Sequence, residues 1–239
     1  QKTTQLNEMN DVIYDAAEGN LIIGEDAGAN LPSSVDGVIL LGKQAGQAGV
    51  DVKEESIAIG LQAAALGLGE STIAIGRSAG HGVNAKNADD SVIIVIGSDS
   101  GIGGTGASSI AIGDTASAKG DRNISVGKNA NLNSTSTQSI CIGESAGRST
   151  VVGTLQGNDF MCIGNEVGQA PNIQSKSISI GSMIGGACCY NGIAVNSVAI
   201  GALAGTTNPP AEGTVSIGFN AGSGTSASVK SKSVQIGDS

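Results

Sequence analysis

The chain contains very few aromatic and charged residues. Among its 239 residues there are no Trp, two Phe and two Tyr, and only 14% of the residues are charged. An ordinary globular domain of this length anchors its core on large side chains, and aromatic residues supply much of the buried area. This composition argues against such a core.

Several functional classes are disfavoured by what the sequence lacks. The formal net charge is −9 and Lys and Arg form no run, so nucleic acid is not an expected partner. No uninterrupted apolar stretch approaches the ~20 residues of a membrane span, so membrane insertion is not expected. A signal-peptide pattern is also missing at the start, but a processed fragment would lack one too, so this says little about export.

The residues that commonly bind metals are few and badly spaced. The four cysteines lack paired metal-ligand spacing, the only histidine is His81, and the calcium-binding Gly-Gly-x-Gly-x-Asp pattern is absent. We therefore expect no metal and no cofactor. Cys141 and Cys162 occupy the same position of successive repeats, where use as small core residues is favoured over a disulfide.

What the sequence does contain is glycine, 38 residues of it, in a recurring pattern. A ten-residue unit recurs from residue 20 to the end, and residues 196–205 represent it: Asn-Ser-Val-Ala-Ile-Gly-Ala-Leu-Ala-Gly. Repeats this frequent determine the architecture, so they are considered before any other feature. The glycine that follows each strand-like triplet, here called the anchor glycine, occurs thirteen times: Gly24, Gly42, Gly60, Gly76, Gly97, Gly113, Gly127, Gly143, Gly164, Gly181, Gly201, Gly218 and Gly237.

The three residues before each anchor glycine predict a β-strand. The first and third are aliphatic, as in Ile57 and Ile59, or once methionine, and therefore share one face of the strand. The middle residue is mostly small and uncharged, which predicts that a second surface packs closely on that face. This small column consists of Ala58, Ala74, Ala111, Ser125, Cys141, Cys162, Ser179, Ala199 and Ser216.

The residues after each anchor glycine predict a bend and a tight interior. An alanine usually follows three positions later, as in Ala63 and Ala204, and is commonly followed by another glycine. The anchor glycine permits a bend that a Cβ would obstruct. One such unit cannot bury its own apolar face, so the units are expected to stack into a solenoid with the apolar columns as ladders.

Two parts of the chain depart from the regular unit. Residues 1–19 precede the repeat domain of residues 20–239, and heptad spacing of Leu6, Met9, Ile13 and Ala16 predicts a short helix over residues 4–17, with an irregular leader as the alternative. Longer connections occur at residues 81–91, 148–159, 186–196 and 206–210. Insertions at one phase of a solenoid emerge on one side, which is commonly the binding side. Candidate receptor contacts in them are Tyr190, Asn191, His81 and Asn84.

With Asn-Ser-Val-Ala-Ile-Gly at 196–201 and Ser-Ile-Ala-Ile-Gly at 56–60 and 109–113, the sequence resembles the YadA-like head repeats of trimeric autotransporter adhesins. Similar repeats occur in bacteriophage tail fibres and receptor-binding proteins, and the resemblance covers residues 20–239. It implies an all-β fold, a left-handed parallel β-roll of about thirteen coils, with three identical chains packed around an axis. Because a close approach between chains requires small residues, the resemblance leads us to expect the small column to be the trimer interface. The resemblance also implies attachment to a bacterial surface glycan or outer-membrane protein, or to host matrix or cells for an adhesin.

Two features separate this chain from the adhesin heads that it resembles. Those heads have shorter and more uniform coils, and exported adhesins of that type generally avoid cysteine. A fibre assembled in the reducing bacterial cytosol has no such constraint. We therefore expect a non-enzymatic tail fibre or receptor-binding tip located in the virion, with an adhesin head at the bacterial cell surface as the alternative.

An enzyme of a different class is the distant alternative. Ile23-Gly24-Glu25-Asp26-Ala27-Gly28 also fits the hexapeptide pattern of left-handed β-helix acyltransferases, and the resemblance would make His81 the candidate base. Most distances between anchor glycines are not multiples of six, however, and only one hexapeptide per coil is recognisable. Catalysis is therefore not expected.

Overall fold

The computed structural model describes residues 12–15, 18–47, 52, 54–67, 69–81, 92–101, 106–131, 136–148, 158–168, 175–181, 195–205, 212–222 and 232–237. The chain divides into two compact units, Gln1–Thr115 and Ala116–Ser239. Each unit is built from short β-strands, and the described residues include no helix. The fold class is therefore all-β, as expected.

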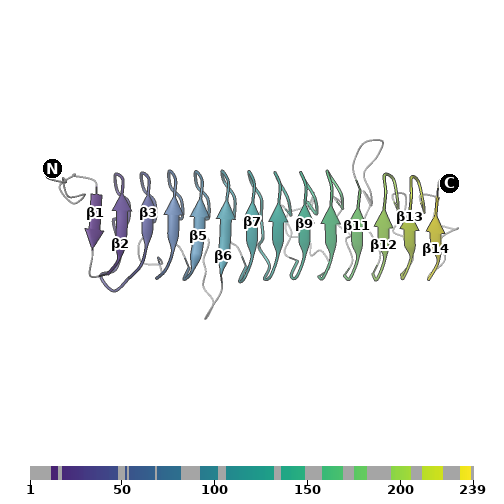
Figure 1. Cartoon of the computed structure of the whole chain (residues 1–239), viewed down its shortest axis with the longest axis horizontal. Helices are drawn as coiled ribbons and strands as arrows, with labels where there is room; N and C mark the ends of the chain where they lie inside the picture. The colour runs from purple at the N-terminus through teal and green to yellow at the C-terminus, as the bar shows by residue number, and fades with distance from the viewer. Residues whose placement is uncertain are drawn as a thin grey trace, which may run out of the picture. The chain divides into compact units, whose positions relative to one another are not determined.

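The first unit holds β1 to β7 and the second holds β8 to β14 (Figure 1). The strands of the first unit are β1 Val12–Asp15, β2 Asn20–Ile23, β3 Ile39–Leu41, β4 Ile57–Ile59, β5 Thr72–Ile75, β6 Ile93–Ile96 and β7 Ile110–Ile112. Those of the second are β8 Ile124–Val126, β9 Ile140–Ile142, β10 Met161–Ile163, β11 Ile178–Ile180, β12 Val198–Ile200, β13 Val215–Ile217 and β14 Val234–Ile236.

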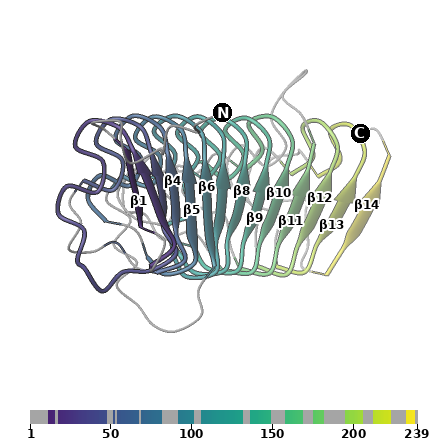
Figure 2. The ribbon, with the colours of Figure 1, turned by 60° about the vertical axis from the view of Figure 1, so that its left-hand side comes forward.

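The thirteen strands β2 to β14 are the thirteen triplets that precede the anchor glycines. Within each unit, every one of these strands pairs in parallel with the next one in the chain, so the strand order follows the sequence. The strands form one wall of the coils, and the connections close the coils behind it (Figure 2). Each unit is thus a parallel β-solenoid, which confirms the prediction of stacked repeats.

The register of the strands aligns equivalent positions of successive repeats. Ile57 pairs with Ile73 and Ile59 pairs with Ile75, while Ala58 lies beside Ala74. In the second unit Cys141 lies beside Cys162. The aliphatic and small columns therefore form continuous ladders in each unit, as the repeat predicts.

The anchor glycines adopt a backbone conformation that other residues rarely reach. Gly42 and Gly60 have φ values of 129° and 133°, a region that is open to glycine because it has no Cβ. An ideal Cβ on Gly42 would lie 2.6 Å from the carbonyl oxygen of Gly60, and one on Gly60 would lie 2.5 Å from that of Gly76. The same close approach of the next coil occurs at Gly24, Gly76, Gly97, Gly127, Gly143, Gly164, Gly201 and Gly218, which confirms the expected role for these anchor glycines.

The turns after the anchor glycines stack through backbone hydrogen bonds. The amide of Gln44 donates to the carbonyl of Glu25 (2.8 Å), and that of Gln62 donates to the carbonyl of Lys43 (2.9 Å). The alanines at the next position are buried, with Ala45 and Ala63 both 0% exposed. The tight interior predicted for these alanines is therefore confirmed.

Two asparagines at strand starts link neighbouring coils through their side chains. Asn20 accepts a hydrogen bond from the Val38 amide (3.0 Å) and donates to the Val35 carbonyl (2.7 Å). Asn123 makes the same pattern with the Ser139 amide (2.9 Å) and the Ser136 carbonyl (2.6 Å). Both side chains are buried, and their bonds satisfy backbone groups in the interior that would otherwise lack partners.

The helix predicted for residues 4–17 is wrong over Val12–Asp15, which form β1. This strand pairs antiparallel with β2, with Val12 opposite Ile23 and Asp15 opposite Asn20 (Figure 1). Two isolated heptads are too short to hold a helix by themselves, whereas the edge of β2 offers unpaired backbone groups to a neighbouring strand. Residues 1–11 lie outside the described part of the chain.

Candidate functional site

The interior of each unit is lined by the small column of the strands. All nine residues of this column that were predicted to contact another chain are 0% exposed within their own chain. These residues are Ala58, Ala74, Ala111, Ser125, Cys141, Cys162, Ser179, Ala199 and Ser216. Their side chains point into their own coil, so the structure does not place them where a partner chain would bind.

The reason for this correction is the narrowness of the coil. The small strand residue faces the buried alanine of the following turn, such as Ala63 or Ala146, across the interior. Because successive strand residues point to opposite sides, a small residue inside forces its two aliphatic neighbours to the outer side. The burial pattern of β4, in which only the middle residue is buried, shows this inversion directly.

The outer side of the strand wall carries two aliphatic ladders, which together we call the aliphatic face. It consists of the first and third residue of each triplet, and none of these residues is buried. In the first unit they are Leu21, Ile23, Ile39, Leu41, Ile57, Ile59, Ile73, Ile75, Ile94, Ile96, Ile110 and Ile112. In the second they are Ile124, Val126, Ile140, Ile142, Met161, Ile163, Ile178, Ile180, Val198, Ile200, Val215, Ile217, Val234 and Ile236.

The aliphatic face is unusual for a solvated surface. It contains no polar or charged side chain in either unit, and each ladder continues over every parallel strand of its unit. Exposure reaches 66% at Val234 and 77% at Ile236 in the last described strand, and it is 39% at Ile142 and 36% at Ile178, where strands on both sides shield the side chains. Contiguous exposed apolar surfaces of this kind mark sites of association rather than surfaces left in water.

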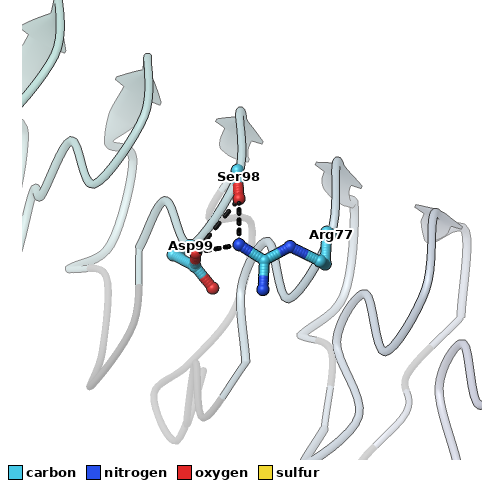
Figure 3. Close-up of polar contacts among 3 residues, drawn as sticks. All are labelled: Arg77, Ser98 and Asp99. Carbon is cyan, nitrogen blue, oxygen red and sulfur yellow. Dashed lines mark hydrogen bonds and ion pairs between the residues drawn. The ribbon is translucent and has the colours of Figure 1, made fainter.

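The turns beside the aliphatic face are polar and solvated. Arg77 Nη2 donates to Asp99 Oδ2 (2.7 Å) and to Ser98 Oγ (2.9 Å) in the next coil (Figure 3). A second pair joins Lys43 Nζ to Glu25 Oε2 (2.8 Å), and the hydrogen bond and charge of Glu25 raise the pKa of Lys43. The basic side chains of both pairs are at least half exposed, so such pairs add little stability.

Most of the predicted receptor contacts lie outside the described residues. This holds for Tyr190, Asn191 and Asn84. His81 is described: it is partly exposed and ends the turn after β5, where its amide donates to the Ser78 carbonyl (3.1 Å). His81 is therefore the one predicted receptor contact within the described part of the chain.

The described interior also accounts for two of the cysteines. Cys141 and Cys162 are buried thiols on neighbouring strands and are not joined in a disulfide. The interpretation of these thiols as small core residues is confirmed. Across the described part of the chain, no helix has the length and apolar character needed to cross a membrane.

Searches against family models, curated proteins and solved structures find no match to this chain. The repeat geometry and the aliphatic face are therefore the basis for a functional argument.

Proposed function

We propose that this chain is a non-enzymatic fibre domain that assembles as a homotrimer through the aliphatic face and attaches a bacteriophage to a bacterial surface. The observation that carries the proposal is the aliphatic face itself. A solenoid that remained a monomer would leave both ladders in water, at a cost of about 25 cal/mol for each Å² of apolar surface that association could bury. Association of identical chains buries equivalent faces together.

The number three comes from the resemblance to trimeric head repeats, and the aliphatic face gives that trimer a physical interface. The proposed interface differs from the one inferred from the sequence, because it uses the large ladders instead of the small column. Each coil would contribute two aliphatic side chains to the shared interior of the trimer. The small column would hold each coil closed from within.

The buried thiols favour a virion component over an exported adhesin. Cys141 and Cys162 are not joined in a disulfide and are 0% exposed, which suits a fibre that folds in the reducing cytosol before release. In this proposal the strands hold the fibre and the long connections between strands provide receptor specificity. Surface loops commonly carry binding residues on a rigid scaffold.

The solution mass of the purified chain tests the assembly. Light scattering is expected to give about three times 23.3 kDa, and reductant is expected to leave that mass unchanged because the described cysteines are not in disulfides. A monomer in both conditions would contradict the proposal.

Binding to whole cells tests the biological role. The labelled trimer is expected to bind intact cells of some strains in a bacterial panel and to show no affinity for matrix proteins such as collagen or fibronectin. The opposite pattern, matrix binding without binding to bacteria, would favour the adhesin head and contradict the virion role.

A further inference from the structure

The interior of the second unit is small and polar around β8 and β9. Among the described residues 116–131 and 136–148, the buried hydrophobic residues are four alanines and Cys141. By contrast, the first unit fills its interior with larger side chains such as Leu40, Ile93 and Val95. In this stretch the buried side chains larger than cysteine are asparagines, Asn123 and Asn131.

Within residues 116–131, three buried side chains have polar atoms with no hydrogen-bond partner. They are the Oγ atoms of Ser117 and Ser125 and both amide atoms of Asn131. Their exposed fractions are 2%, 0% and 0%. Buried polar groups in folded proteins are nearly always bonded to protein or to an ordered water, so four such atoms in one stretch require an explanation.

The repeat shows where these side chains point. Asn131 occupies the fourth position after its anchor glycine, where Gly147 and Gly222 occur in other coils. A Cβ on Gly222 would lie 2.5 Å from Ser216 Oγ in its own coil and 2.9 Å from Gln235 Oε1 in the next. A Cβ on Gly147 would likewise meet Cys141 Sγ in its own coil.

By the same geometry, Asn131 points toward Ser125, the small-column residue of its own coil. Ser117 occupies the equivalent position one coil earlier, although without the positive φ that Asn131, Gly147 and Gly222 share. The Ser117 amide donates to the Ala130 carbonyl (3.0 Å), which places Ser117 beside Asn131. Ser117 and Asn131 thus lie side by side in successive turns of the second unit, and the Asn131 side chain is directed toward Ser125.

We propose that Ser117, Ser125 and Asn131 bind an ordered water inside the coil. The chemistry fits water because the two hydroxyls and the amide donate and accept, and a buried water needs two to four polar partners. No charged side chain is buried among the described residues 116–131 and 136–148, so an ion would have no opposite charge to pair with. This water takes the place that larger aliphatic side chains fill in the first unit.

A high-resolution crystal structure of the full chain provides the direct test. The expected result is an ordered water within about 2.7–3.2 Å of an Asn131 amide atom and of Ser125 Oγ. The proposal is overturned if the density at this place is empty, or if the Asn131 side chain bonds to the backbone instead.

A stability cycle gives an independent test in solution. Ser125→Ala is expected to lower Tm by about 2–4 °C at fixed protein concentration, because it removes one partner of the water. In an Asn131→Gly background the same change is expected to leave Tm unchanged or to raise it. Comparing Ser125→Ala in the two backgrounds removes the separate effect of Asn131→Gly on the backbone.

Ser179→Ala is the matched control, because Ser179 is also buried and unpartnered but pairs with Cys162 and Ala199 on the neighbouring strands. It is expected to leave Tm unchanged or raise it. Equal effects of Ser125→Ala in both backgrounds, in either direction, would overturn a shared water.

Discussion

Replacing Gly60 with alanine is expected to destabilise the protein by about 4 kcal/mol and to lower Tm by roughly 8–16 °C. The new Cβ would lie 2.5 Å from the carbonyl oxygen of Gly76 and 2.7 Å from its carbonyl carbon. Both atoms belong to the backbone of the next coil, so no side-chain rotation relieves the clash. The φ of 133° adds backbone strain that glycine does not have.

Thermal unfolding followed by circular dichroism measures the loss, and hydrogen exchange locates it. We expect the amides of β4 and β5 to lose protection first, because the clash separates these two strands. Each coil of a solenoid depends on its neighbours, so one broken contact weakens the stack locally.

Gly37→Ala is the matched control for this prediction. Gly37 also has a positive φ, 69°, but a Cβ there would meet nothing closer than 3.7 Å. Its expected cost is only the ~1–2 kcal/mol of an alanine in the left-handed region. Equal losses in the two variants would mean that backbone conformation, and not the stacking of the coils, explains the role of the anchor glycine.

Much of the fold could be predicted from the sequence because the same types of residue recur at the same positions of successive repeats. The triplets before the anchor glycines are the thirteen parallel strands, and buried residues such as Ala45 and Ala63 lie where the pattern places them. Because many copies of the pattern agree on where the strand lies, an atypical residue in one copy does not obscure the prediction. The N-terminal segment occurs once, so its heptad spacing competed with an available strand edge and predicted the wrong structure over Val12–Asp15.

The sequence did not reveal which face of the strands points inward. Side chains alternate along a strand, so Ala58 and Ile59 lie on opposite faces. The sequence shows the same alternation whether the face with Ala58 or the face with Ile59 is buried. The usual expectation that large aliphatic residues lie inside fails here because the strand position that faces the interior carries a small residue in most coils, and the aliphatic residues beside it face outward. The alanine three positions after most anchor glycines was the available signal, since a small residue in the turn fits a narrow interior in which the strand also presents a small residue.

The buried asparagines were also missed by the sequence analysis. Asn20 and Asn123 precede apolar triplets, at the position that Ser56 and Ser109 occupy in other coils, and nothing in their local sequence distinguishes them from exposed polar residues. Their hydrogen bonds join residues 13 to 18 positions apart, in the next coil. Contacts of this kind follow from the stacking of coils and cannot be read from one repeat.

An acidic residue on the aliphatic face is expected to dissociate the assembly while the coil stays folded. Ile75 lies in β5 with its side chain on this face and only partly exposed, between the rungs at Ile59 and Ile96. In a trimer, Ile75→Asp would remove three buried side chains worth about 1.5–3 kcal/mol each and would bring three carboxylates together in an apolar interior. The light-scattering mass should fall from about three times 23.3 kDa to a single chain.

Leu66→Asp is the matched control, because Leu66 is an apolar residue that is 52% exposed and lies in a connection outside the aliphatic face. It is expected to leave the mass unchanged. Because an aspartate can also weaken a strand, the double variant Ile59→Thr and Ile75→Thr provides a second test that keeps β-branched residues in β4 and β5. Circular dichroism should show that the strands persist in all three variants, so that a fall in mass reports separation of the chains.

These outcomes distinguish the two possible faces of the strand wall. A fall in mass for both aliphatic-face variants, with Leu66→Asp unchanged, would place the interface on the large ladders. If both variants remain folded at the full mass, the chains associate elsewhere and the aliphatic face is not the interface. Even in that case the small column is not the interface, because Ala58 and Ala74 are 0% exposed and cannot contact a partner chain.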